Sequence, residues 1–132
     1  MQTKRREGFT LVEIMIVVSI IALLAAIALP GFLRARKRSQ AASVLTDLRL
    51  IDSAVEQYAL EHNQIRGFEV TYDMWKVYMK PGSRLYTTGA DITGQPFGSV
   101  LVDESPEVPA ATYDTLIEVT NDAYWSPYQR AP

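Results

Sequence analysis

The chain has 132 residues, of which 48% are hydrophobic and 21% are charged, so its length allows one small domain and excludes a large multidomain enzyme. Cysteine is absent, which excludes disulfides, thiolate metal sites and cysteine nucleophiles, and His62 is the single histidine. The net charge of -2 is too balanced to indicate nucleic acid or a membrane surface as a partner.

Charge is distributed unevenly along the chain. Residues 34–49 carry five basic side chains and one acidic side chain, a net charge of +4. Residues 50–132 carry five basic and twelve acidic side chains, a net charge of -7. A basic segment therefore joins an apolar N-terminal part to an acidic body.

The stretch 9–29 is apolar, and Glu13 is its only charged residue. It follows a basic stretch at residues 4–6. As a helix it would be about 31 Å long, which matches the hydrocarbon core of a bilayer. The residues alone leave three interpretations open: a secretory signal peptide cut after Ala28, an uncut membrane anchor, or a helix whose leader is cut before Phe9.

Glu13 is the informative residue of this stretch, because an ionised carboxylate inside a membrane helix costs about 3 kcal/mol. Cleavage between Gly8 and Phe9 would create an α-amino group one helical turn before Glu13. That amine is largely protonated near neutral pH and could neutralise the carboxylate within one chain or between neighbours. The alternative is that Glu13 lies at the membrane interface near a helix N-terminus, where the helix dipole favours an acid.

Residues 4–13, Lys-Arg-Arg-Glu-Gly-Phe-Thr-Leu-Val-Glu, and the apolar helix that follows resemble the class III signal of type IV prepilins and type II secretion pseudopilins. The resemblance implies that a prepilin peptidase cuts after Gly8 and methylates the new N-terminal Phe9. It also implies that Glu13 aligns subunits during assembly and that the helix bends or loosens at Pro30.

The charges around the apolar stretch disagree with this topology. Four basic residues at 34–38 follow it, against three basic residues and Glu7 before it, so the positive-inside rule would place the C-terminus in the cytoplasm. The resemblance places the C-terminus outside, and we follow the resemblance because its motif is more specific.

Beyond the apolar stretch the pattern predicts a second, amphipathic helical half. Pro30 lacks an amide hydrogen and Gly31 adds flexibility, so we expect a kink or break near residues 26–31. We expect one long helix over about 9–63, with His62 as a C-terminal cap or surface residue. Apolar residues then recur at helical spacing: Ala41, Val44, Leu48, Ile51, Val55 and Tyr58.

The C-terminal part is rich in aromatic and turn residues. Thr71 is expected to cap a short helix over 72–79, and Thr112 a last helix that ends near Val119. We also expect turns at 88–91 and 93–96, a strand at 97–102 and an acidic loop at 103–109. Trp75 and Trp125 are candidates for a small core on the long helix.

These elements predict an α+β, pilin-like fold: a long kinked N-terminal helix, half transmembrane and half amphipathic, packed against a small C-terminal body with short helices and a small antiparallel sheet. The expected parts are a cleaved leader (1–8), a hydrophobic helix (9–30), an amphipathic helix (31–64) and the body (65–132).

We find no pattern for catalysis, and we expect neither an enzyme nor a bound cofactor or metal. Pilins that resemble this chain often close a C-terminal loop with a disulfide, and major pseudopilins use calcium. Asp103, Glu104 and Glu107 are oxygen donors of the kind calcium prefers, but their spacing fits no ligand motif and favours a solvated acidic loop.

The resemblance therefore implies a structural subunit of a type IV pilus-like filament, with a type II secretion pseudopilin as the first choice. A type IV pilus subunit is the alternative, and a membrane-tethered extracytoplasmic binding module is the alternative of another class. Expected partners are further copies and related subunits, prepilin peptidase, an inner-membrane assembly platform and, before assembly, lipid; we do not expect nucleic acid. The expected location is the bacterial inner membrane, crossed once, and then a periplasmic or extracellular filament.

Overall fold

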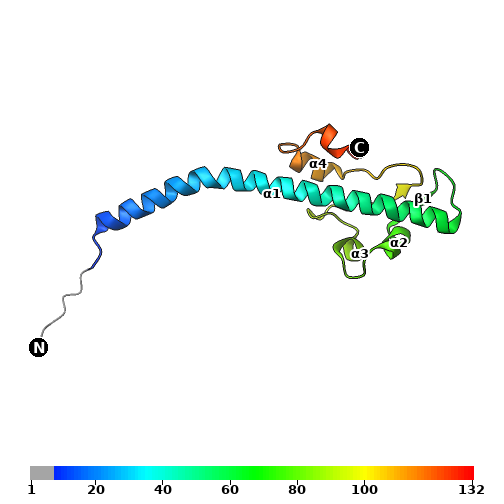
Figure 1. Cartoon of the computed structure of the whole chain (residues 1–132), viewed down its shortest axis with the longest axis horizontal. Helices are drawn as coiled ribbons and strands as arrows, with labels where there is room; N and C mark the ends of the chain where they lie inside the picture. The colour runs from blue at the N-terminus through cyan, green and yellow to red at the C-terminus, as the bar shows by residue number, and fades with distance from the viewer. Residues whose placement is uncertain (1–7) are drawn as a thin grey trace, which may run out of the picture. The chain divides into compact units, whose positions relative to one another are not determined.

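A computed structural model describes residues 8–132 (Figure 1). The contacts divide the chain into two units, residues 1–35 and 36–132. The elements in chain order are α1 (Leu11–His62), β1 (Glu69–Val70), α2 (Tyr72–Trp75), the 3-10 helix η1 (Lys76–Tyr78), α3 (Arg84–Thr88), β2 (Val100–Leu101), α4 (Ala110–Leu116) and α5 (Asp122–Trp125).

The described part of the first unit, residues 8–35, contains the N-terminal part of α1. All of its residues are exposed, including the long apolar run. By length and composition α1 contains one window that is apolar enough to cross a membrane. Exposed apolar surface of this extent indicates a lipid or protein environment rather than water.

Helix α1 continues through Pro30 and Gly31 without a break. Proline removes one backbone hydrogen bond, and a long helix that is stabilised on both sides of that position tolerates the loss. The break that we allowed for near residues 26–31 is therefore absent, and the kink at Pro30 stays a prediction.

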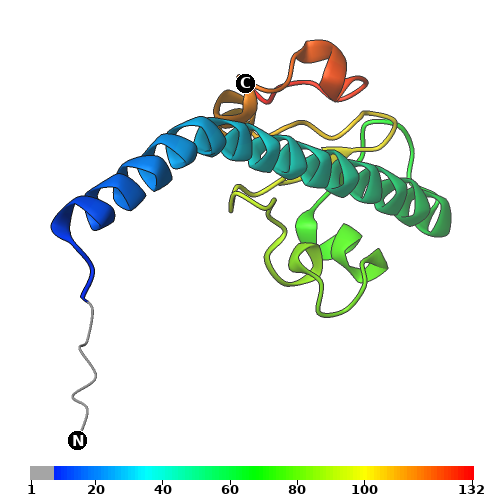
Figure 2. The ribbon, with the colours of Figure 1, turned by 60° about the vertical axis from the view of Figure 1, so that its left-hand side comes forward.

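The second unit is organised around residues 36–62 of α1. The buried stripe of this helix contains five of the six predicted positions, and the sixth, Tyr58, is half-buried. The short helices α2 and α3 lie on one side of α1, and α4 and α5 lie on the other (Figures 1 and 2). Trp75 and Trp125 are fully buried, as expected, so each side places one indole in the core.

The sheet of the body is small and antiparallel. It pairs β1 with β2, in the register Glu69 with Leu101 and Val70 with Val100. The predicted strand at 97–102 is shortened because Gly98 has a φ of 73° and the amide of Phe97 donates to the carbonyl of Gly89 instead of to a strand. The α+β fold is confirmed, with more short helix and less strand than the pattern suggested.

The cap predictions had mixed outcomes. Thr71 precedes α2 as expected, but its side chain makes no capping hydrogen bond. The prediction that Thr112 caps the last helix is wrong: α4 begins at Ala110, and Thr112 is buried within it, where its hydroxyl donates to Asp91. A buried carboxylate 21 positions earlier uses the hydroxyl that the sequence pattern assigned to a helix end.

Two short helices were not predicted. Helix α3 is capped at its N-terminus by Ser83, whose side chain accepts a hydrogen bond from the amide of Tyr86, and at its C-terminus by Gly89, which has a φ of 61°. Helix α5 is capped at its N-terminus by Asn121, whose side chain accepts a hydrogen bond from the amide of Tyr124. Serine, asparagine and glycine at these positions are the usual helix boundary residues, so the signals were present in the sequence.

Candidate assembly site

The N-terminal end of α1 contains the residues that the sequence singled out. Gly8 and Phe9 are exposed and precede the first turn, while residues 4–7 of the motif lie outside the described residues. Helix α1 starts at Leu11, so Phe9 and Thr10 lead into it.

Glu13 forms a capping box with Thr10. The backbone amide and the hydroxyl of Thr10 donate to Oε2 of Glu13, at 2.8 and 3.0 Å, and the amide of Glu13 donates back to Oγ1 of Thr10 at 3.3 Å. Each residue thus satisfies donors that a helix start leaves unpaired. This capping role was not predicted, although the spacing Thr10-x-x-Glu13 is the signature of a capping box.

This geometry gives the Glu13 carboxylate partners within one chain. Its position beside the helix N-terminus agrees with the interpretation that the dipole favours an acid there. The α-amino group that cleavage before Phe9 would create lies outside this capping box, so it remains available to Glu13 of the same chain or of a neighbour.

One face of the apolar helix is shallowly grooved, with a volume of about 460 Å³. Ser19 lies on this face, and its hydroxyl donates to the carbonyl of Met15 at 2.7 Å, so the polar atom is satisfied within the helix. A satisfied serine leaves the face apolar to any neighbour. The groove is lined by Val12, Met15, Ile16, Ser19, Ile20 and Leu23.

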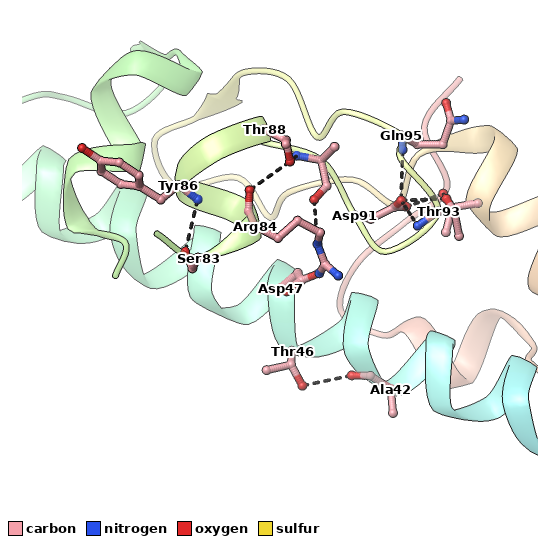
Figure 3. Close-up of polar contacts among 12 residues, drawn as sticks. Ala42, Thr46, Asp47, Ser83, Arg84, Tyr86, Thr88, Asp91, Thr93 and Gln95 are labelled. Atoms are coloured by element: carbon pink, nitrogen blue, oxygen red, sulfur yellow. Dashed lines mark hydrogen bonds and ion pairs between the residues drawn. The ribbon is translucent and has the colours of Figure 1, made fainter. Parts of the chain in front are cut away.

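The body has a polar cluster that attaches its loops to α1 (Figure 3). Arg84 forms an ion pair with Asp47 of α1, and its Nε donates to the carbonyl of Ala90 at 3.1 Å. Asp91 is buried and accepts hydrogen bonds from Thr93 and Gln95 as well as from Thr112. These contacts stabilise residues 84–95 against both α1 and α4.

Asp47 is the member of this cluster whose pKa is shifted. Burial raises the pKa of its carboxyl group, Arg84 opposes that shift, and the nearby Asp91 adds to it. The pKa stays raised because the single guanidinium does not fully offset burial. The cluster is a structural anchor whose stability depends on Arg84.

The acidic loop shows no metal geometry. Asp103, Glu104 and Glu107 are exposed, and among residues 8–132 no group of three or more histidine or carboxylate side chains could hold a metal ion. His62 is exposed at the end of α1, where its ring stacks on Tyr58 with centroids 4.2 Å apart.

Comparison with known proteins supports the motif that was predicted in the N-terminal segment. Residues 3–29 match the family model of the prokaryotic N-terminal methylation motif. This segment is similar to the N-terminal segments of type IV pilins and of a type II secretion system core protein. The motif and the long apolar helix together indicate membrane anchoring.

The similar proteins include both pilins and a secretion protein. The chain is 41% identical over 64 residues to the type IV major pilin protein PilA of Myxococcus xanthus, and 40% identical over 60 residues to the type IV wide pilus major component PilA4 of Thermus thermophilus. It is 29% identical over 98 residues to the type II secretion system core protein G of Aeromonas hydrophila.

The matches to the pilins are partial. They span 29% of the Myxococcus pilin and 46% of the Thermus pilin, and 48% and 46% of this chain. The match to core protein G spans 68% of that protein and 73% of this chain. None of these names denotes an enzyme, and no solved structure matches the chain.

Proposed function

We propose that this protein is a structural subunit of a pilus-like filament, and specifically a type II secretion pseudopilin. The observation that carries the proposal is the N-terminal methylation motif placed at the start of a fully exposed apolar helix. The choice of a pseudopilin is supported by the match to core protein G of Aeromonas hydrophila, which covers 98 residues, while the pilin matches cover 60 to 64 and two further core protein G matches cover 60 and 61.

In this proposal processing prepares the helix for assembly. Prepilin peptidase cuts between Gly8 and Phe9, removes the basic leader (residues 1–8) and methylates Phe9. The leader charges that hold the N-terminus at the cytoplasmic face of the inner membrane are then gone. An assembly platform in that membrane extracts the helix, and residues 9–30 pass from lipid into a bundle of identical or related helices in a periplasmic or extracellular filament.

Glu13 aligns the incoming subunit with its neighbour during this transfer. Before assembly its carboxylate is held in the capping box with Thr10, which lowers the cost of an acid near the membrane. In the filament interior the charge needs a cation, because a buried carboxylate without one costs several kcal/mol. The amine at Phe9 of a neighbouring subunit supplies that cation.

The proposal is tested by Glu13→Gln in cells that produce the filament. Glutamine keeps an oxygen that accepts hydrogen bonds from Thr10, so helix start and membrane insertion should match the wild type, while the missing charge should remove most filaments. Electron microscopy of sheared filaments and the membrane content of the subunit are measured together. Filaments at the wild-type level would show that the charge is not needed.

The wild-type chain in the same experiment, together with a secretion assay, separates the other candidates. A membrane-tethered binding module would give no filaments from the wild-type chain, with normal membrane content. A type IV pilus subunit would give filaments without supporting protein secretion, whereas a pseudopilin supports secretion in a strain that lacks its own major pseudopilin.

A further inference from the structure

An acidic groove lies in the second unit, between the C-terminal part of α1 and the loop that follows β2. Its volume is about 530 Å³. Asp52 and Glu56 of α1 line one side, Asp103 and Glu104 of the loop line the other, and Val55 and Val102 contribute apolar surface. Four carboxylates thus surround a partly apolar channel.

These carboxylates have no ion-pair partner in the part of the chain that the structure describes. Asp52 and Glu56 are one helical turn apart, and the pKa of Asp52 is raised by burial and by the charge of Glu56. The groove therefore carries an unbalanced negative charge.

The complementary charge lies elsewhere on the same chain, in the basic neck formed by Arg34, Arg36, Lys37 and Arg38. Lys37 is paired with Glu118 at 2.5 Å. Arg36 and Arg38 are exposed, and neither has a carboxylate partner within the described residues. Two guanidinium groups are thus available to another molecule.

We propose that the acidic groove of one subunit binds the basic neck of a neighbouring copy. The neck cannot reach the groove of its own chain, because Arg38 and Asp52 are separated by 14 residues of continuous helix, about 21 Å along its axis. Groove and neck are different surfaces, so the contact is heterologous, and such a contact generates an open filament when its rotation does not close a ring. The inference rests on the proposed filament function.

A second copy fits the groove better than a metal ion does. In residues 8–132 the carboxylates do not converge in any group of three that could hold an ion. They are distributed along the groove on two elements, which suits guanidinium groups spaced along a helix. The apolar surface of Val55 and Val102 suits the aliphatic stems of arginine side chains.

Cysteine cross-linking tests the contact in filaments of the full chain, which has no cysteine of its own. Ser39→Cys lies in α1 beside the neck, Ser105→Cys lines the groove, and both positions are exposed. With a short bismaleimide, the double variant should give a ladder of multimers, and each single variant should give none. A matched control combines Ser39→Cys with Val77→Cys, an exposed position that does not line the groove, and should also give no ladder.

Charge exchange tests the cause of the contact. Glu56→Lys with Glu104→Lys should abolish the ladder of the Ser39→Cys/Ser105→Cys chain, and both residues are exposed, so folding should be kept. Adding Arg36→Glu and Arg38→Glu should restore it. A ladder that survives the first reversal, or is not restored by the second, overturns the inference.

Different experimental results would overturn the filament function and the contact between groove and neck. Filaments in the electron microscope without a groove-to-neck ladder would overturn the inference and leave the filament function standing. The absence of filaments from the unmodified chain would overturn the filament function and the inference with it.

Discussion

At the scale of single residues, two acids define the two halves of this molecule. Glu13 is held by Thr10 at the start of the apolar helix, and Asp47 is held by Arg84 in the middle of the body. Both carboxylates lie where charge is costly, and each depends on named partners. Their environments differ, because Glu13 is exposed in the single chain whereas Asp47 is already buried.

The environment of Asp47 leads to a prediction about how folding stability depends on pH. In Arg84→Met the carboxylate loses its cation and keeps its burial, so its pKa should rise further above the ordinary value. A carboxyl group whose pKa is higher in the folded than in the unfolded state makes stability fall as pH rises between those two values. The variant should lose about 2 kcal/mol at neutral pH, and less near pH 4.

The measurement is urea unfolding of the full chain in detergent, followed by the fluorescence of Trp75 and Trp125, which are both buried in the body. Arg130→Met is the matched control, because Arg130 pairs with an exposed partner, Asp114. An equal loss of stability at pH 4 and pH 7 in Arg84→Met would contradict the account.

At the scale of elements, the second half of α1 is the support of the body. Leu48 is fully buried on its inner stripe, and Leu60 on the same helix is 80% exposed. Leu48→Ala should lower the free energy of unfolding by about 3 kcal/mol, because it leaves a cavity in the core. Leu60→Ala should change it by less than about 0.5 kcal/mol. Similar losses in the two variants, measured by the same unfolding experiment, would show that the body does not pack on this stripe.

Some of these elements could be predicted from the sequence and others could not. The stripe of α1 was predictable because a 3.6-residue period over six positions, from Ala41 to Tyr58, reflects a single physical cause. The short helices α3 and α5 were missed although Ser83 and Asn121 are usual helix boundary residues, because helices of five and four residues are too short to show an apolar period that supports the cap. Thr112 was misassigned because no local pattern reveals that Asp91 needs its hydroxyl.

The candidate site was predictable to a similar degree. Gly8, Phe9 and Glu13 could be selected from a contiguous motif, and the family match covers the same residues. The capping box was equally local and was overlooked. The acidic groove could not be located, since it joins residues 52–60 of α1 and Gln64 to the loop at 102–105, which only the folded chain brings together.

At the scale of the whole molecule, the chain is divided into two parts of different chemistry. An apolar helix carries the methylation motif, and an acidic body carries the groove. The central claim is that the first part is processed and then assembled. Every later step, from the pairing of Glu13 to the contact between groove and neck, follows only if the leader is removed.

The most direct test is the N-terminus of the protein recovered from membranes, determined by intact mass and terminal sequencing. The account predicts a chain that starts at an N-methylated Phe9. A chain that starts at Leu29 would be a secreted domain, and a chain that keeps Met1 would be a tethered one. Either result would contradict the filament account.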